Sequence, residues 1–264
     1  MPRPKRPGTS LGVAAKVSEN LLFTLDAYQI DINDRVINSE RLVKSDIKAL
    51  QTPAFSNINE IRFFTNAIDT RTRGLDLVTT YKTEFSERSR LTASLAFTIN
   101  ATNITATGAT PAELQAGTVK PILLIDTVSI GLIERAQPRQ KILLSATYTI
   151  GKFSITPRAS YFGAVTAFEK PANIAATTTT PARYVKHISQ EFSGKTLFDL
   201  ALVYTPARAV AITLGANNFT NVYPDRVDSR RFASYSNGEI PYSRNVAQFG
   251  FNGAYYYTNV ALTF

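Results

Sequence analysis

The stretch FNGAYYYTNVALTF, residues 251–264, decides the fold class of this chain. One side of the extended strand that it predicts carries Tyr256, Val260, Leu262 and Phe264, and the other carries Tyr255, Asn259, Ala261 and Thr263. A strand of about 9–11 residues crosses a bilayer when one face meets lipid and the other meets a polar lumen, with aromatic residues at the interfaces. An edge strand of a soluble β-sandwich is the alternative, so the rest of the chain must decide.

The period-two pattern of residues 249–264 recurs in eight earlier segments. They span residues 10–17, 21–34, 61–81, 90–100, 141–150, 153–161, 196–204 and 210–218. Their polar sides carry small residues such as Thr, Ser, Ala, Gly and Asn, which suit a barrel lumen better than the solvent face of a soluble sheet. The pattern therefore predicts an outward, lipid-facing band of Leu91, Leu95, Phe97, Ile142, Leu144, Ile155, Leu200, Leu202, Ile212, Leu214, Val260 and Leu262.

The connections between these segments alternate in length. Short ones lie at residues 18–20, 82–89, 151–152 and 205–209, and long polar ones lie at about 35–60, 101–138, 162–195 and 219–248. Outer-membrane barrels are built in this way, with short periplasmic turns and long extracellular loops. Nine strands is an odd number, whereas single-chain bacterial barrels close with even numbers. We therefore expect an all-β antiparallel meander that forms part of a transmembrane β-barrel. Pro157 counts mildly against any continuous ladder.

Composition excludes several other classes. The 264 residues are 44% hydrophobic with a mean hydropathy of -0.08, and the most apolar run, PILLIDTVSIGLI at 121–133, is too short for a membrane helix and contains Asp126. The net charge of +9 is spread over scattered residues, so it does not indicate nucleic-acid binding. The N-terminal region lacks a signal-peptide pattern, which we interpret as a fragment or a start inside a longer gene.

Neither an enzyme nor a metal site is expected. The chain has no Cys, and its one histidine, His187, lies in a polar stretch, so we expect no thiolate or histidine metal site. The carboxylates of DINDR (31–35) and DRVDSRR (225–231) lie in polar segments where no desolvated acid–base pair can be argued. We expect no cofactor, and the sequence identifies no substrate-binding residue.

Four segments resemble a known family. They are LLFTLDAYQIDINDRV (21–36), FFTNAIDTRTRGLDL (63–77), LGANNFTNVYP (214–224) and the terminal strand with its final Phe264. The second carries an Asn…Arg-Gly-hydrophobic-acidic motif, and the third a partial Asn-Asn…Tyr element. The motif residues are Asn66, Arg73, Gly74, Leu75, Asp76, Asn217, Asn218 and Tyr223. Together these segments resemble the C-terminal part of TonB-dependent outer-membrane receptors.

This resemblance implies a fold and partners. The family's barrel has 22 strands around a plug and imports ferric siderophores, vitamin B12, haem or oligosaccharides. Residues 1–264 would then be the C-terminal portion of such a barrel, without the plug, the TonB box or the first strands. Expected partners are membrane lipid and lipopolysaccharide, the barrel-assembly machinery through the strand ending at Phe264, and TonB only in the full-length protein. The expected location is the outer membrane of a Gram-negative bacterium.

The long loops would form part of an outer vestibule. Basic residues there would favour anionic ligands, although pairing with lipopolysaccharide phosphates or with Asp225 and Asp228 is the preferred interpretation. These basic residues are Arg183, Lys186, Arg226, Arg230, Arg231 and Arg244. Tyrosines 235, 242 and 255–257 could contact a ligand, but an interfacial girdle is preferred. A passive porin-like or structural barrel is the first alternative function, and a soluble all-β binding module is the second.

Overall fold

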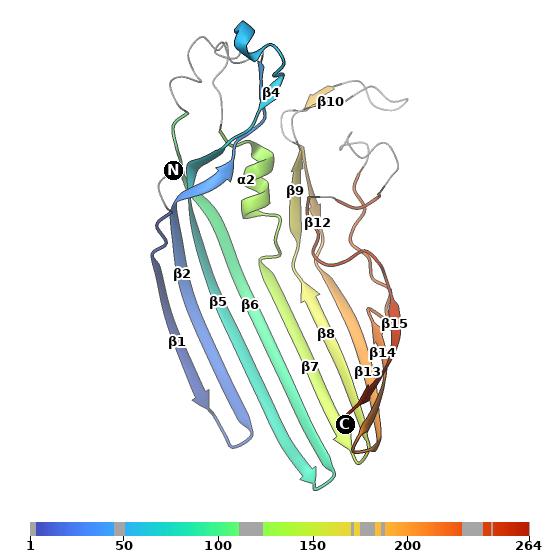
Figure 1. The fold of residues 1–264 in the computed structure, drawn as a ribbon. Coiled ribbons are helices and arrows are strands. Elements are labelled where there is room, and N and C mark those ends of the chain that lie inside the picture. The colour runs from blue at the N-terminus through green and yellow to red at the C-terminus, as the bar shows by residue number, and fades with distance from the viewer. Residues whose placement is uncertain are drawn as a thin grey trace.

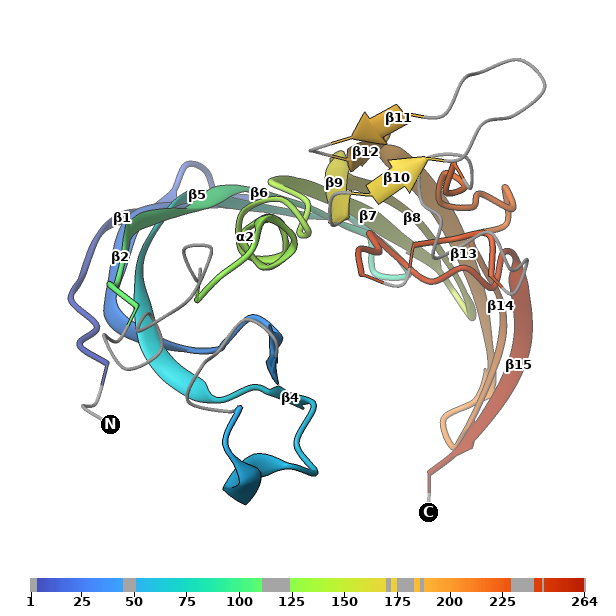
Figure 2. The same ribbon diagram turned by 90° about the horizontal axis from the view of Figure 1, so that it is seen from above.

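A curved nine-stranded wall dominates the computed structural model, which describes residues 4–44, 51–110, 124–169, 172–174, 183–185, 188–228, 240–243 and 245–263. Figures 1 and 2 show the wall from the side and from above. In spatial order its strands are β1 (Gly8–Lys16), β2 (Leu21–Asn38), β5 (Phe64–Ser86), β6 (Ser89–Thr107), β7 (Gln140–Ile150), β8 (Phe153–Phe162), β13 (Lys195–Ala207), β14 (Val210–Asn217) and β15 (Tyr255–Leu262).

Every pair of neighbouring strands in the wall is antiparallel. The predicted meander is therefore confirmed. The short connections lie at one end of the wall, the turn end, and the long connections lie at the other, the loop end (Figure 1). The edge strands β1 and β15 both run from the loop end to the turn end, so they are parallel to each other.

The observed strands are longer than predicted around the first two hairpins. Strands β5 and β6 continue to a turn at residues 87–88, where a wider turn at 82–89 was expected. In contrast, the last strand begins only at Tyr255 and not at residue 249. Gly151 has a φ of 57° in the β7–β8 turn, a conformation that glycine adopts without steric cost.

The two faces of the wall differ as predicted. Cross-strand partners share a face, and the register pairs Leu95 with Leu144 and Ile155 with Leu202. Followed across all strands, this register places all twelve predicted band residues on one face. Thr70 and Ser160 lie on the other face and are buried, because segments on the inside of the curve cover them. The polar face is therefore concave, and the apolar face is convex (Figure 2).

Aromatic rings border the convex apolar band at both ends. Near the turn end, Phe153 stacks on Tyr204 at 4.8 Å and Phe85 meets Tyr148 edge-on at 6.3 Å between ring centroids. Tyr161 lies near the loop end of β8, eight residues beyond Phe153. Eight residues span about 27 Å along a strand. Allowing for strand tilt, this spacing is close to the height of about 25 Å typical of a membrane barrel's apolar band.

Pro157 is accommodated inside β8. On one side of β8, Pro157 pairs with Leu200 of β13. On the other side, the ladder between β8 and β7 is interrupted at Pro157, between the pairs Ser145–Arg158 and Tyr148–Ile155. The register is unchanged across the gap. Proline lacks an N–H donor, so this local gap is the expected consequence.

The long connections contain secondary structure that was predicted as loop. They carry a 3-10 helix at Pro53–Phe55, α2 (Thr127–Glu134), and the hairpins β3 (Leu42–Val43) with β4 (Glu60–Ile61), β9 (Val165–Glu169) with β12 (Ile188–Phe192), and β10 (Ala172–Ile174) with β11 (Arg183–Val185). Asp126 caps α2 by accepting a hydrogen bond of 2.7 Å from the Ser129 backbone N–H. None of the described helices is long and apolar enough to span a membrane.

The buried hydrophobic cluster lies at the loop end and not in the wall. Its members are Ala136, Val165, Ala167, Ile188, Phe192 and Val246, with Val227 packed against them. These residues come from the β9–β12 hairpin, the segment after α2 and the segment between β14 and β15. The band residues of the wall stay partly exposed, and Leu214, for example, is 55% exposed. A soluble β-sandwich would instead bury this band between two sheets.

Candidate functional site

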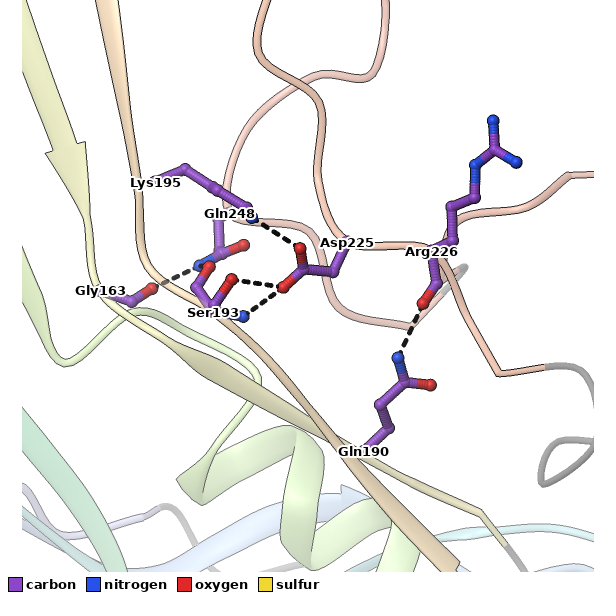
Figure 3. Close-up of polar contacts among 7 residues, drawn as sticks. All are labelled: Gly163, Gln190, Ser193, Lys195, Asp225, Arg226 and Gln248. Atoms are coloured by element: carbon purple, nitrogen blue, oxygen red, sulfur yellow. Dashed lines mark hydrogen bonds and ion pairs between the residues drawn. The ribbon is translucent and has the colours of Figure 1, made fainter.

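Asp225 joins two segments at the loop end, the one that follows β14 and the one that leads from β12 into β13 (Figure 3). Its carboxylate accepts hydrogen bonds of 2.6 Å from the backbone N–H and the hydroxyl of Ser193, and it pairs with the Lys195 ammonium at 2.6 Å. Ser193 lies between β12 and β13, and Lys195 begins β13. The carboxylate therefore fixes the segment after β14 to the base of a hairpin that rises from the wall.

Electrostatics favour the charged form of Asp225. Burial alone would raise the pKa of this carboxyl group, but the hydrogen bonds from Lys195 and Ser193 outweigh that effect and lower the pKa below its ordinary value. The charged, docked state is therefore the one present at neutral pH.

Two glutamines add further links in the same region. The Gln248 amide donates to the backbone carbonyl oxygens of Gly163, at 2.6 Å, and Ser193, at 3.0 Å. The Gln190 amide donates to the backbone carbonyl of Arg226 at 2.7 Å and accepts from the Asp228 N–H at 2.8 Å (Figure 3). The segment between β14 and β15 is thus tied to the β9–β12 hairpin by side-chain contacts to backbone groups.

Three stacked rings lie beside these links. Tyr242 stacks on Tyr223 at 6.2 Å and on Phe251 at 5.7 Å between centroids. Tyr223 and Phe251 are 39% and 46% exposed, so the stack presents aromatic surface to the solvent at the loop end. The enclosed space between this stack and the buried cluster measures only about 10 Å³, so a ligand could meet only the outer surface.

The Asn217–Asn218 element builds the turn that ends β14. Asn218 has a φ of 47°, in the left-handed region that asparagine tolerates. Its side chain bonds both the carbonyl and the N–H of Val222, at 2.7 and 3.0 Å, while its own N–H donates to Asp199 at 2.7 Å. Asn221 then accepts from the Ala254 N–H at 3.0 Å, next to the start of β15. These residues shape the backbone and leave little polar capacity for a ligand.

The Arg73-Gly74 element also has a structural role. A Cβ atom at Gly74 would collide with the ring of Tyr28, which crosses over it on the concave face. Arg73 lies on the convex face and donates to Gln29 at 2.8 Å, and next to it Arg71 pairs with Asp31 at 2.6 Å. This polar patch lies beyond the loop end of the apolar band.

The concave face is polar along the length of the wall. Hydroxyl pairs bridge adjacent strands, as in Ser94–Ser145 at 2.9 Å and Thr149–Ser154 at 2.9 Å. Two carboxylates, Asp26 and Asp76, face each other across β2 and β5. Among the described residues neither forms an ion pair, and like charges in this arrangement repel. The face therefore offers a site for a cationic group inside the curve.

A polar hollow of about 760 Å³ opens at the turn end of the same face. Its charged lining residues are Glu19, Lys82, Glu84 and Arg90, and Thr147 and Thr149 form its floor. Both signs of charge are represented, so the hollow suits a polar peptide segment better than a simple ion. No cluster of metal-ligand residues occurs in the part of the chain that the structure describes.

The structure gives mixed outcomes for the residues singled out in the loops. Asp225 pairs with Lys195, which was not among the six basic residues named above, and of those six only the side chain of Arg226 is described. Lys186, His187, Arg230, Arg231, Tyr235, Arg244 and Phe264 lie outside the described residues, as does the side chain of Arg183. The girdle interpretation is wrong for Tyr255 and Tyr257, because both pair with residues of the concave face and stack on each other at 5.6 Å. Tyr242 belongs to the loop-end stack.

A wall with an apolar convex face, aromatic borders and a polar concave face is a segment of a transmembrane β-barrel. Residues 8–219 match the sequence profile of the family described as TonB dependent receptor-like, beta-barrel. The chain belongs to this family. No curated protein matches the sequence closely enough to count as a relative.

Solved structures share the fold at low sequence identity. The outer membrane transporter YddB from Escherichia coli has a TM-score of 0.63 at 10% identity, with 99% of this chain and 33% of YddB covered. The FrpB iron transporter from Neisseria meningitidis (F5-1 variant) has a TM-score of 0.57 at 12% identity, with 97% of this chain and 31% of FrpB covered. The copper transporter OprC has a TM-score of 0.54 at 14% identity, with 99% of this chain and 31% of OprC covered. The chain thus spans about a third of the length of these structures.

Proposed function

We propose that this chain is the C-terminal part of the barrel of a TonB-dependent receptor in the outer membrane of a Gram-negative bacterium. The receptor would import a scarce nutrient such as a ferric siderophore, a vitamin, haem or an oligosaccharide. The observation that carries the proposal is the two-faced wall, whose convex side suits lipid and whose concave side suits a polar plug. The related structures include iron and copper transporters, which supports uptake as the general role.

Closure of the barrel supports the proposal that further strands take part. Open strand edges are costly in lipid, because unpaired backbone groups find no water there. Since β1 and β15 run in the same direction, antiparallel closure needs an odd number of additional strands. Thirteen strands, as the 22-stranded family type requires, satisfy that parity.

The concave face supports a plug as the occupant of the lumen. The opposed carboxylates Asp26 and Asp76 would gain from a cationic side chain of the plug, and the hydroxyl pairs would offer it hydrogen bonds. The polar hollow at the turn end would hold the plug segment that leads toward TonB in the periplasm. In this proposal the loop-end assembly around Asp225, with the exposed stack of Tyr223, Tyr242 and Phe251, forms part of the outer vestibule.

The remaining partners follow from the same placement. Lipopolysaccharide phosphates would contact the loop-end rim of the convex face, where Arg71 and Arg73 lie. The barrel-assembly machinery would recognise the strand that ends at Phe264.

Nutrient uptake tests this proposal. A strain lacking the gene is supplied with the complete polypeptide, and uptake of labelled ferric siderophores, vitamin B12, haem and oligosaccharides is measured with and without TonB. We expect energy-dependent uptake of one of these classes, and no uptake with residues 1–264 alone. TonB-independent diffusion of many small solutes would instead support a passive porin. Recovery of a monodisperse chain without detergent would support a soluble binding module.

A further inference from the structure

We propose that the convex face of the wall holds one anionic phospholipid of the periplasmic leaflet, in an apolar groove at the turn end. This proposal rests on the membrane orientation in the proposed function. The groove has a volume of about 360 Å³ and extends across the neighbouring strands β7, β8, β13 and β14. Its lining on this face consists of Tyr148, Ile150, Phe153, Ile155, Leu202, Tyr204, Ile212 and Leu214.

The size and chemistry of the groove fit an acyl chain. At about 30 Å³ for each group, the volume of one water molecule, the space holds about a dozen methylene-sized groups. The lining side chains are aliphatic or aromatic, and they belong to the face that meets hydrocarbon in a barrel. The stacked rings of Phe153 and Tyr204, whose centroids are 4.8 Å apart, form one side of the groove.

Two turns border the groove where the lipid headgroup would lie. Lys152 lies in the turn between Ile150 and Phe153, and its ammonium donates to the Pro206 carbonyl at 2.7 Å. The Thr205 N–H donates back to the Lys152 carbonyl at 2.9 Å. These two bonds hold the β7–β8 turn against the end of β13, so the position of Lys152 beside the groove is fixed. One N–H of its ammonium is used, and two remain for a phosphate oxygen.

Charge in this region favours an anionic headgroup. Arg208 lies in the neighbouring β13–β14 turn, two residues after Pro206. The sequence contains no Asp or Glu from Arg135 to Phe168 or from Leu200 to Pro224, the stretches that supply the lining of the groove and both turns. The one carboxylate in these four strands, Asp199 of β13, lies on the concave face, where it pairs with Arg158 at 3.7 Å. Cations near a membrane surface attract anionic lipids. Lys152 and Arg208 therefore select a phosphatidylglycerol or cardiolipin headgroup over a zwitterionic one.

Lipid retention by the purified complete receptor tests this site. The receptor in detergent is mixed with equal amounts of phosphatidylglycerol and phosphatidylcholine, and bound lipid is counted by native mass spectrometry. We expect one retained phosphatidylglycerol. Lys152→Gln and Arg208→Gln should each reduce its retention about fivefold, and Lys152→Arg should restore it. Lys16→Gln, a matched change at the turn end of β1, four strands away from β7, should have no effect.

A second pair of variants tests the groove itself. Ile155→Trp fills the groove and should abolish retention, whereas Leu144→Trp adds the same ring elsewhere on the convex face and should leave it unchanged. Equal retention of both lipids, or retention insensitive to Lys152→Gln and Ile155→Trp, would overturn the proposed lipid site. Nutrient uptake is measured separately on the same variants. If the receptor selects the anionic lipid but takes up no nutrient, the result would count against the proposed function alone. If it takes up a nutrient but does not select the lipid, the result would count against the lipid site alone.

Discussion

A charge placed in the middle of the convex face should prevent assembly, whereas the same charge one residue away should not. Leu144 lies on the convex face of β7, is 50% exposed, and has Leu95 and Ala159 as its cross-strand neighbours. It lies four residues from Tyr148 of the turn-end aromatic border, about 14 Å along the strand, which places it near the middle of the band. Leu143, its neighbour in sequence, lies on the concave face beside Ala96 and Ser160.

The expected cost follows from that position. Arginine near the bilayer midplane costs about 2–4 kcal/mol, so Leu144→Arg should lower the equilibrium constant for assembly of the receptor by roughly 30- to 700-fold. Leu143→Arg faces the polar lumen and should cost less than about 1 kcal/mol. The assay is the fraction of complete receptor that resists urea extraction from outer membranes and shows heat-modifiable mobility. Equal defects in both variants, or a larger defect for Leu143→Arg, would refute the assignment of the two faces.

Three further predictions concern the loop-end assembly and the family motif. Asp225→Asn should weaken loop docking by about 1–2 kcal/mol, because a charge-assisted bond to a partly exposed carboxylate is lost. Faster hydrogen exchange at the Ser193 amide would show this, and unchanged exchange would contradict it. Because the folded-state pKa of Asp225 is lowered, its stabilising contribution should be complete above about pH 4 and disappear as the pH falls through that lowered value. Exchange measured against pH should show this loss in the wild type and not in Asp225→Asn. Gly74→Val should lower the free energy of unfolding in urea by about 1–3 kcal/mol, because the new side chain displaces the ring of Tyr28. In a double variant, Tyr28→Ala should relieve part of that loss. If the losses of the two single variants simply add, the contact between these residues is excluded.

The strands of the wall could be predicted from sequence because each presents one face to each environment. In β7 the alternation of Ile142, Leu144 and Ala146 with Ser145 and Thr147 is a local signal, and the observed strand differs from the predicted one by a single residue. Strand ends were less accurate near the turns, since polar residues of β5 and β6 continue the ladder beyond the apolar band.

The loop-end assembly could not be predicted in the same way. Asp225 and Lys195 are separated by 30 positions, and no local pattern marks their pairing. The hairpin of β9 and β12 consists of two short strands whose burial depends on Val246 and Val227, far along the chain. Helix α2 did carry a readable signal, since Asp126 is a favourable N-cap, but its eight residues lack a clear apolar stripe. The Asn218 turn was recognised as a motif, although its role became clear only from its contacts.

The most direct test of the central claim is cysteine accessibility along β7. Residues 1–264 contain no cysteine, and any cysteine elsewhere in the complete receptor is first replaced by serine. Single cysteines replace residues 142 to 147 in turn in the complete receptor, and each carries a nitroxide label in native-like bilayers. Collisions with oxygen, which dissolves in lipid, are compared with collisions with a water-soluble nickel chelate. The two-faced wall predicts lipid exposure at 142, 144 and 146 and water or plug contact at 143, 145 and 147. Uniform accessibility along these six positions, or water contact at Leu144, would contradict the claim.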